Sequence, residues 1–347
     1  MTGSNPKTVL DSLNQGLYQA LRDDPQVILM GEDLTDPYGG AFKVTRGLST
    51  AFPNRVITTP ISEAGITGMA GGMALRGMRP VVEIMFGDFT TLIMDQVINH
   101  LTKFSAMYHG LVNASVMIRT PMGGRRGYGP THSQTLEKFF LGAPGLTVLA
   151  PFNLMSDVSI GAPGQLLYEA ILKLNSPVLF VENKLQYTLK LRSAADLGEY
   201  SLASSNSAEG IHAPFYRLVL QSAPSASFTL AAYGHMAHMA LEALYRLAYE
   251  HEIFCELWVP TQLAPFMLTP LIESVAHTGC LLAVEEGTLS LGWGAEVLAR
   301  TAEALGPRLR KAGRLAAKET VVPAAPELEA ECLPDTEDII KRVLEMV

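Results

Sequence analysis

The stretch from Pro60 to Pro80, PISEAGITGMAGGMALRGMRP, predicts a helix that leads into a strand, and this pairing sets the fold of the first domain. Ala64, Gly68 and Gly72 recur at every fourth position, so on a helix they form one nearly bare stripe. Each interior glycine costs up to ~1 kcal/mol relative to alanine, and the stripe therefore predicts close contact with another backbone. Glu63 opens this helix, either as an ordinary first-turn acid or as a functional group.

The same alternation of strand and helix continues on both sides of this stretch. Short apolar runs predict strands at QVILMGED, RPVVEIMF, ASVMIRTP, LTVLAP and SPVLFVEN, and helical spacing marks TVLDSLNQGLYQALRDDP and FTTLIMDQVINHLTKF. This order is typical of an α/β fold with a mainly parallel sheet flanked by helices. Ligands of such sheets bind at the carboxyl ends of the strands, so we expect functional residues just after them.

A break in the pattern predicts two domains. Residues 1–190 form the first, residues 191–227 are rich in small and polar side chains and predict a linker, and residues 228–347 show a second alternation of strands and helices. The segment VSIGAPGQLLYEA contains a Gly-Ala-Pro-Gly break in its helical pattern. The final segment predicts a capped amphipathic helix that Asp335 or Thr336 opens.

Composition excludes several classes of protein. The 347 residues carry a net charge of −8, which argues against binding of nucleic acid or an anionic membrane through bulk electrostatics. The three cysteines are too few and too dispersed to predict a zinc site or a disulfide framework. No run of ~20 apolar residues and no secretory leader is present, so we expect a cytoplasmic protein.

Several motifs, taken together, resemble one family. GEDLTDPYGGAFKVTRGL, TPISEAGITGMAGGMALRGMRPVVEIMFGDF, DQVIN, PMGGRRGYGPTHSQTLEKFF, PGLTVLAP, SPVLFVENK and AVEEGTLSLGWGAEV follow each other in an order similar to that of one subunit type. It is the beta subunit of the decarboxylating component of thiamine-diphosphate-dependent 2-oxo acid dehydrogenases, a family that includes the pyruvate, branched-chain 2-oxo acid and acetoin dehydrogenases. The resemblance implies a transketolase-like pyrimidine-binding domain followed by a transketolase C-terminal-like domain.

The resemblance also implies roles for individual residues. Glu63 would hold a proton against the aminopyrimidine of thiamine diphosphate, whose exocyclic nitrogen then deprotonates the thiazolium carbon. Ile61, Met85 and Phe89 would line the aminopyrimidine, with the aromatic residue stacked on it, although core packing alone also explains three apolar residues. His132, in the loop GRRGYGPTHSQ, would act on the substrate and in acyl transfer; the alternative is a histidine bonded to its own loop.

What the chain lacks is equally informative. Relatives bind the diphosphate and magnesium through a Gly-Asp-Gly segment, which this sequence does not contain. The family pattern assigns that half of the site, with its magnesium, to an alpha subunit in an assembly of two alpha and two beta chains, and predicts no metal ligands here. Leu174 and Ser176 stand where some relatives hold potassium, so a potassium site is doubtful. Arg125 and Arg126 would bind a substrate carboxylate or a partner's acid, or be solvated.

The expected activity is decarboxylation of a small 2-oxo acid and transfer of the acyl group to lipoamide, with a lipoyl acyltransferase as a further partner. Two alternatives stay open. One is a subunit of a split transketolase-like carboligase, which begins with the same chemistry and differs in its acceptor. The other is a non-catalytic assembly subunit, against which the presence of both Glu63 and His132 argues.

Overall fold

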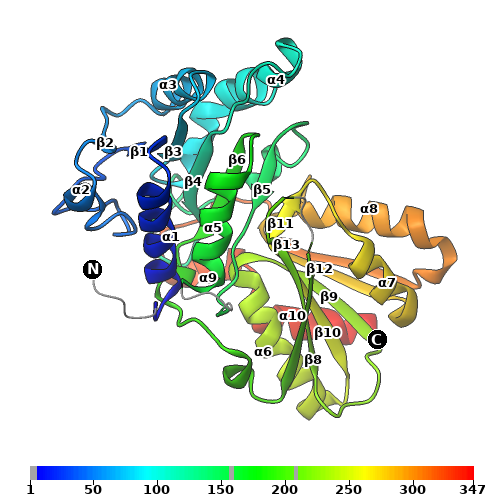
Figure 1. The fold of residues 1–347 in the computed structure, drawn as a ribbon. Coiled ribbons are helices and arrows are strands. Elements are labelled where there is room, and N and C mark those ends of the chain that lie inside the picture. Colours follow the sequence, from blue (N-terminus) through cyan, green and yellow to red (C-terminus); the bar gives the residue numbers. More distant parts are fainter. Residues whose placement is uncertain (1–5, 156–159, 207–209) are drawn as a thin grey trace.

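A computed structural model describes residues 6–155, 160–206 and 210–347. Two sheets, each flanked by helices, form its framework, as predicted (Figure 1). The first sheet has the order β11-β5-β6-β4-β3-β1-β2 and is parallel except for β11. Its strands are β1 (Val27–Gly31), β2 (Val56–Thr58), β3 (Arg79–Glu83), β4 (Met117–Met122), β5 (Thr147–Leu149), β6 (Val178–Asn183) and β11 (Gln262–Ala264).

Helices cover both faces of this sheet because neighbouring strand residues point in opposite directions. Val81 packs into the core beneath α1 (Val9–Asp23) and α5 (Gly161–Lys173), whereas Val82 packs into the core beneath α3 (Glu63–Leu75). The remaining helical elements of the first domain are α2 (Leu48–Ala51), η1 (Gly87–Ile93), η2 (Gln96–Leu101), α4 (Phe104–Met107), η3 (Glu137–Phe139), η4 (Gln186–Thr188) and η5 (Ala194–Leu197).

The Gly-Ala-Pro-Gly segment begins a helix rather than breaking one. Helix α5 starts at Gly161, and Pro163 lies in its first turn, where a missing N–H leaves no intrahelical bond unmade. A β-carbon on Gly16 of α1 would lie 2.5 Å from the carbonyl oxygen of Gly164, so these glycines let α1 and α5 pack backbone to backbone. The first two residues of the quoted segment, at positions 158 and 159, lie outside the described residues.

The predicted helix FTTLIMDQVINHLTKF is irregular in the structure. It divides into the 3₁₀ helix η1, the π-helix η2 and the short α4. The hydroxyls of Thr90 and Thr91 donate to the carbonyl oxygens of Gly87 and Asp88, at 2.6 and 3.0 Å. Such bonds to the preceding turn compete with regular α-helical bonding, which the spacing of apolar residues does not reveal.

The second sheet has the order β13-β12-β9-β10-β8-β7. Its strands are β7 (Tyr200–Asn206), β8 (Pro214–Leu220), β9 (Phe228–Ala232), β10 (Cys255–Pro260), β12 (Cys280–Thr288) and β13 (Lys311–Ala317). Strands β7 and β8 lie within residues 191–227, where the sequence predicts a linker, and they pair antiparallel at one edge of the sheet. This segment therefore contributes two strands of the second sheet.

Helices of the second domain also lie on both faces of its sheet. Helix α6 (Gly234–His251) and α10 (Thr336–Met346) share one core with β9 and β10, and α7 (Thr269–Thr278) and α8 (Trp293–Leu305) pack on the other face. Asp335 caps α10, as predicted, by accepting a bond from the Asp338 N–H. Between these elements lie η6 (Gly306–Arg308) and α9 (Pro326–Cys332).

The two domains are joined by more than the chain between them. Strand β11 follows β10 in the sequence but pairs antiparallel with β5 of the first sheet. One buried apolar cluster contains Ile84 and Met122 of the first domain together with Tyr233 and Trp293 of the second. No helix within the described ranges is long and apolar enough to cross a membrane.

Candidate functional site

Three predicted residues, Glu63, Phe89 and His132, lie after strands of the first sheet, and so do Glu32 and Lys184, which sequence reasoning did not single out. Glu32 follows β1, Glu63 follows β2, Phe89 follows β3, His132 follows β4 and Lys184 follows β6. These strands are adjacent and parallel, in the order β6-β4-β3-β1-β2. Because the carboxyl ends of parallel strands meet at one edge, the five residues belong to the same edge of the sheet.

Glu63 is held by the start of α3. It is the first residue of that helix and is 8% exposed, and the helix is anchored below it by the buried side chains of Ile66 and Ala70. Glu32 lies close by: burial, and then the charge of Glu63, raise the pKa of the Glu32 carboxyl above its usual value. The buried Oε1 of Glu32 has no hydrogen-bond partner within the described residues, so this acidic pair is open to a donor from outside the chain.

The glycine stripe of α3 faces away from the described part of this chain. Gly68 and Gly72 are exposed, and a β-carbon on Gly72 would have no neighbour within 4 Å. Ile61, Met69 and Leu92 form an exposed apolar surface beside it, and Ile61 is 83% exposed. The close contact that the stripe predicts is therefore not made by any described element of the same chain.

An aromatic cluster surrounds His132. Its ring lies 4.6 Å from the ring of Phe86 and 5.3 Å from that of Phe89, nearly perpendicular to both. The Nδ1 atom is 2.9 Å from the hydroxyl of Thr131. Nε2 makes no hydrogen bond within the described residues, so one ring nitrogen is available for chemistry while the aromatic rings and the Thr131 hydroxyl hold the imidazole. Met85, just before Phe86, is half-buried.

Lys184 lies beneath the loop that carries His132. Its side chain is fully buried, its ammonium donates a hydrogen bond to the carbonyl oxygen of His132, and it lies 5.2 Å from the centre of the Phe86 ring. Burial lowers the pKa of Lys184 to about 8, against the opposing charges of Asp88 and of Glu286 and Glu329 from the second domain. The charged form of Lys184 is therefore costly to bury, and the negative charges of these three acids stabilise it.

Glu63 and His132 follow strands that are not neighbours in the sheet. Strands β2 and β4 have β1 and β3 between them, so their ends are separated by three strand spacings of ~4.8 Å, or about 14 Å. Phe89, after β3, lies between the two. The edge therefore has an acidic end at Glu63 and Glu32, an aromatic middle, and an imidazole end.

Comparison with known proteins identifies the family of both domains. The family model of the "Transketolase, pyrimidine binding domain" matches residues 6–190, and that of the "Transketolase, C-terminal domain" matches residues 218–339. The pyruvate dehydrogenase E1 component subunit beta-1 of Arabidopsis thaliana is 33% identical over 98% of this chain and 89% of its own length. The E1 component subunit beta of Leifsonia xyli is 34% identical over 98% of this chain and 93% of its own length. The chain belongs to the transketolase-like family of E1 beta subunits.

A solved structure supports the fold alone. The protein described as "Split gene transketolase, inactive beta4 tetramer" superposes with a TM-score of 0.73 over 98% of each chain, at 18% identity. The match extends through both domains, which confirms the predicted two-domain α/β architecture.

E1 beta subunits belong to a thiamine-diphosphate-dependent family, and the edge described above fits one half of that cofactor. The unpartnered Oε1 of Glu32 beside Glu63 suits a nitrogen-bearing ring, and the half-buried Met85 and Phe89 supply apolar contact. Within the described residues no three His, Cys, Asp or Glu side chains gather as metal ligands.

Arg125 serves neither role that the sequence suggests. Its guanidinium donates to the carbonyl oxygens of Pro334 at 2.6 Å and of Leu333 at 3.3 Å, both in the second domain. Arg126 is exposed, and its charge helps to lower the pKa of Lys184. Arg125 is thus committed to holding the two domains together, and only Arg126 is free to meet a partner.

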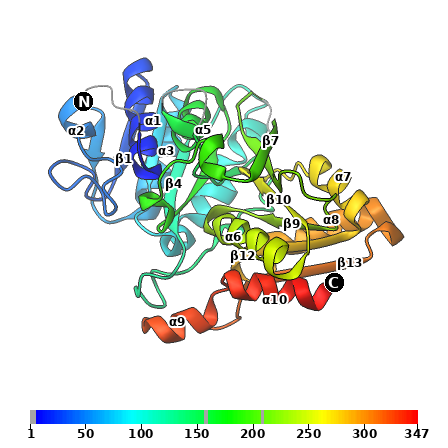
Figure 2. The ribbon, with the colours of Figure 1, turned by 90° about the horizontal axis from the view of Figure 1, so that it is seen from below.

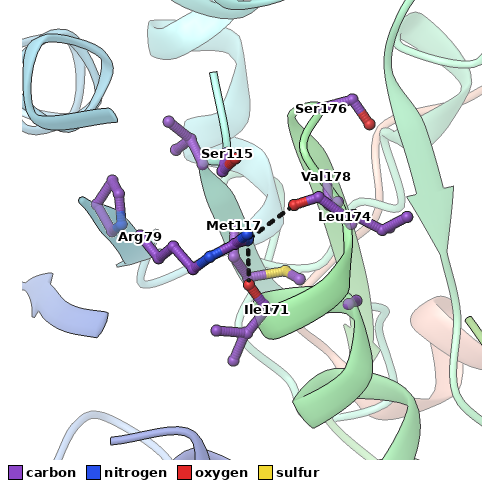
Figure 3. A pocket seen from close by; sticks show the side chains of 10 residues that line it. Arg79, Ser115, Met117, Ile171, Leu174, Ser176 and Val178 are labelled. Atoms are coloured by element: carbon purple, nitrogen blue, oxygen red, sulfur yellow. Dashed lines mark hydrogen bonds between the residues drawn. The ribbon is translucent and has the colours of Figure 1, made fainter. Parts of the chain in front are cut away.

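The segment that corresponds to the potassium site of some relatives holds an arginine instead. The Arg79 guanidinium donates to the carbonyl oxygens of Ile171 and Leu174 at 3.0 and 2.9 Å (Figure 3). It also donates to Oδ1 of Asn175 at 2.9 Å. The small pocket around these atoms has no room for a water molecule. The residues present do not fit a potassium ion, because the Arg79 guanidinium already bonds the carbonyl oxygens at the end of α5.

Sequence reasoning missed the residues that surround His132. Lys184 could have been found, since a lysine directly after the buried strand SPVLFVEN lies at the edge where ligands bind. Phe86 is adjacent to the predicted Met85. Glu286 and Glu329 gave no signal, because nothing in their local sequence places them against a loop more than 150 residues away.

Proposed function

We propose that this chain is the beta subunit of a 2-oxo acid dehydrogenase decarboxylating component, active with an alpha subunit. The complex decarboxylates a small 2-oxo acid and passes the acyl group to the lipoyl group of an acyltransferase. The observation that carries this proposal is the single edge of the sheet whose strands lead to Glu63, Phe89 and His132.

Each residue has a distinct task in this proposal. Thiamine diphosphate, when bound, supplies the electron sink for decarboxylation at its thiazolium carbon. Glu63 shares a proton with a ring nitrogen of the aminopyrimidine. Its position at the start of α3 orients the carboxylate for this contact. Ile61, Met85 and Phe89 line that ring. His132 moves a proton on the substrate side through the free Nε2 atom, at the opposite end of the edge.

The alpha subunit would cover the exposed side of α3. Gly68 and Gly72 leave space for a helix from outside the chain, and Ile61, Met69 and Leu92 add an apolar surface next to Glu63. An apolar surface with bare glycines beside a half-formed site suits a partner that completes the site. The two-alpha, two-beta assembly follows if each partner chain contributes its own diphosphate and magnesium residues.

A test of the proposal begins with the chain alone and continues with its partner. Calorimetry on the isolated chain should detect weak or no binding of thiamine diphosphate with magnesium, and tight magnesium-dependent binding would contradict the shared site. Co-expression with an alpha subunit should yield a stable complex. That complex is then assayed with pyruvate and branched-chain 2-oxo acids.

The acceptor separates the dehydrogenase from its alternatives. Turnover with a lipoyl domain supports the proposal. Turnover only with an aldehyde or ketone acceptor would establish the carboligase. A complex that binds the cofactor but turns over no 2-oxo acid with any acceptor, and in which Glu63→Gln changes nothing, would establish an assembly subunit.

A further inference from the structure

The loop that carries His132, residues 123–135, is held by the second domain. A single carboxylate, that of Glu329 on α9, accepts hydrogen bonds from two backbone N–H groups of the loop. Oε1 lies 2.8 Å from the nitrogen of Arg125, and Oε2 lies 3.1 Å from the nitrogen of Gly127. Glu329 is 3% exposed although its neighbours Glu327 and Glu331 are exposed. The helix α9 therefore directs one of its three acids into the loop.

The shape of the loop requires this contact. Arg125 and Gly127 have φ angles of +63° and +67°, in the left-handed region that a non-glycine residue seldom occupies. In this conformation the two N–H groups point to the same side and form a concave donor pair that suits a carboxylate. Without Glu329, two part-buried N–H donors would lose their protein partner, and nothing would offset the strain of the left-handed backbone at Arg125.

Further contacts hold the same loop on either side. Glu286 on β12 accepts a bond from the Gly124 N–H at 2.7 Å and another from the side chain of Asn183 at 2.8 Å. The Arg125 guanidinium bonds the carbonyl oxygens that follow α9. Figure 2 shows α9 extending from the second domain beneath the first. The start of the loop is thus bound to three separate parts of the second domain.

The far end of the loop carries the reactive group. Lys184 bonds the carbonyl oxygen of His132, and Asp88 accepts bonds from the backbone and side chain of Gln134 at 3.3 and 2.8 Å. The charge of Glu329 also acts on Lys184. One carboxylate of the second domain therefore acts on both ends of the loop.

We propose that Glu329 is a positioning residue for His132, so that the C-terminal segment of the second domain is a working part of the site. Glu329 touches neither substrate nor cofactor; it fixes the loop from which His132 reaches the substrate. The catalytic part of this inference rests on the proposed function, whereas the structural part does not.

The first test measures the loop itself. Amide hydrogen exchange is followed in the complex with the alpha subunit and in the isolated chain, for wild type, Glu329→Gln, Glu329→Ala and the exposed control Glu331→Ala. Both Glu329 variants should exchange faster in residues 123–135 and not in β3 or α6. Glu331→Ala should match the wild type. Unchanged exchange in the loop of both Glu329 variants would overturn the inference.

The second test is a double-mutant cycle. Glu329→Ala alone should lower turnover roughly 10- to 100-fold, the size of effect expected when a catalytic group is misplaced. In the His132→Ala background the same change should cost little more, because the group it positions is already gone. Proton exchange at the thiazolium carbon, which depends on Glu63, should stay unchanged. A full, additive loss in the His132→Ala background would overturn the positioning role.

The two tests separate this inference from the proposed function. If amide exchange in residues 123–135 rises in the Glu329 variants but the wild-type complex turns over no 2-oxo acid, Glu329 still holds the loop and the proposed function fails. If the wild-type complex is active and Glu329→Ala is additive with His132→Ala, the proposed function stands and the positioning role fails.

Discussion

Glu63 and His132 lie at the same edge of one sheet but are positioned in different ways. Glu63 is the first residue of a 13-residue helix whose buried face packs on the first sheet, all within about 30 residues of the chain. His132 lies in a loop bonded to Lys184 of its own domain and to Glu286, Glu329 and the segment after α9 of the other.

This contrast separates local from long-range control of a site. A carboxylate at a helix start needs only the helix and the strand beneath it, so disturbing the second domain should leave Glu63 in place. His132 has only the Thr131 hydroxyl and the Gly129 carbonyl oxygen as local partners. The bonds that anchor its loop to Asp88, Lys184 and Glu329 span 46, 52 and 204 positions of sequence. Variants can test this distinction, starting with the end of the site that depends on local structure.

The largest effect is expected for Glu63→Gln. An amide cannot share a proton with the aminopyrimidine, so activity should fall toward or beyond the upper end of the ~10²- to 10⁴-fold range of acid–base catalysis. Folding and assembly should stay nearly intact. The measurement is proton exchange at the thiazolium carbon by NMR in the reconstituted complex. Asp33→Asn, an exposed acid at the same edge, is the control; wild-type exchange in Glu63→Gln would remove Glu63 from its role.

The next effect belongs to the other end of the edge. His132→Ala should leave thiazolium proton exchange unchanged and slow a later step, with a loss of ~10²- to 10³-fold. The loss should be larger with a lipoyl domain as acceptor than with an artificial oxidant. The exposed His251→Ala serves as control. Equal losses with both acceptors would place His132 at substrate binding or decarboxylation, and no loss would leave it a residue of the loop only.

A smaller, pH-dependent effect is expected at Lys184. Its pKa is lowered to about 8 by burial, so the ammonium that holds the His132 carbonyl is charged below about pH 8 and loses its charge as the pH rises through that value. Wild-type turnover should therefore fall on this alkaline side. Lys184→Arg, which stays charged, should flatten the fall, and Lys184→Met should lower turnover about tenfold at pH 7, as expected for loss of one charged hydrogen bond.

The same alkaline fall in wild type and Lys184→Arg would assign the fall to a group other than Lys184. The charged groups facing Lys184 are Asp88, Glu286, Glu329 and Arg126.

The smallest functional effect is expected at Arg79, far from both ends of the edge. Arg79→Met should lower the free energy of unfolding by about 2–3 kcal/mol, since three charged hydrogen bonds at the end of α5 are lost. Turnover per folded complex should be unchanged. The exposed Arg76→Met is the control. Wild-type melting temperature should be equal in potassium chloride and choline chloride; stabilisation by potassium alone would contradict the assignment of Arg79 as the internal cation.

Much of the framework was predictable because its signals are local. The strand QVILMGED, the helix from Glu63 and the cap at Asp335 each follow from spacing, burial and capping within a few residues. The irregular η1 and η2 were not predictable from apolar spacing, because the hydroxyls of Thr90 and Thr91 redirect bonds in the preceding turn. Strands β7 and β8 were missed for another reason. The serine-rich edge strand β7 has the composition of a linker, and the apolar strand β8 beside it was included in the same predicted linker.

The sequence on its own determined the order of strands and helices, the two-domain division, and the presence of Glu63, Phe89 and His132 directly after strands, because these depend on short-range pattern. Only the tertiary structure decided how His132 is held. Glu329 and Arg125 meet across 204 positions of sequence, and the burial of Lys184 exists only once both domains enclose it. Contacts of that span cost chain entropy that no local motif encodes, and they form only when the whole fold offsets that cost.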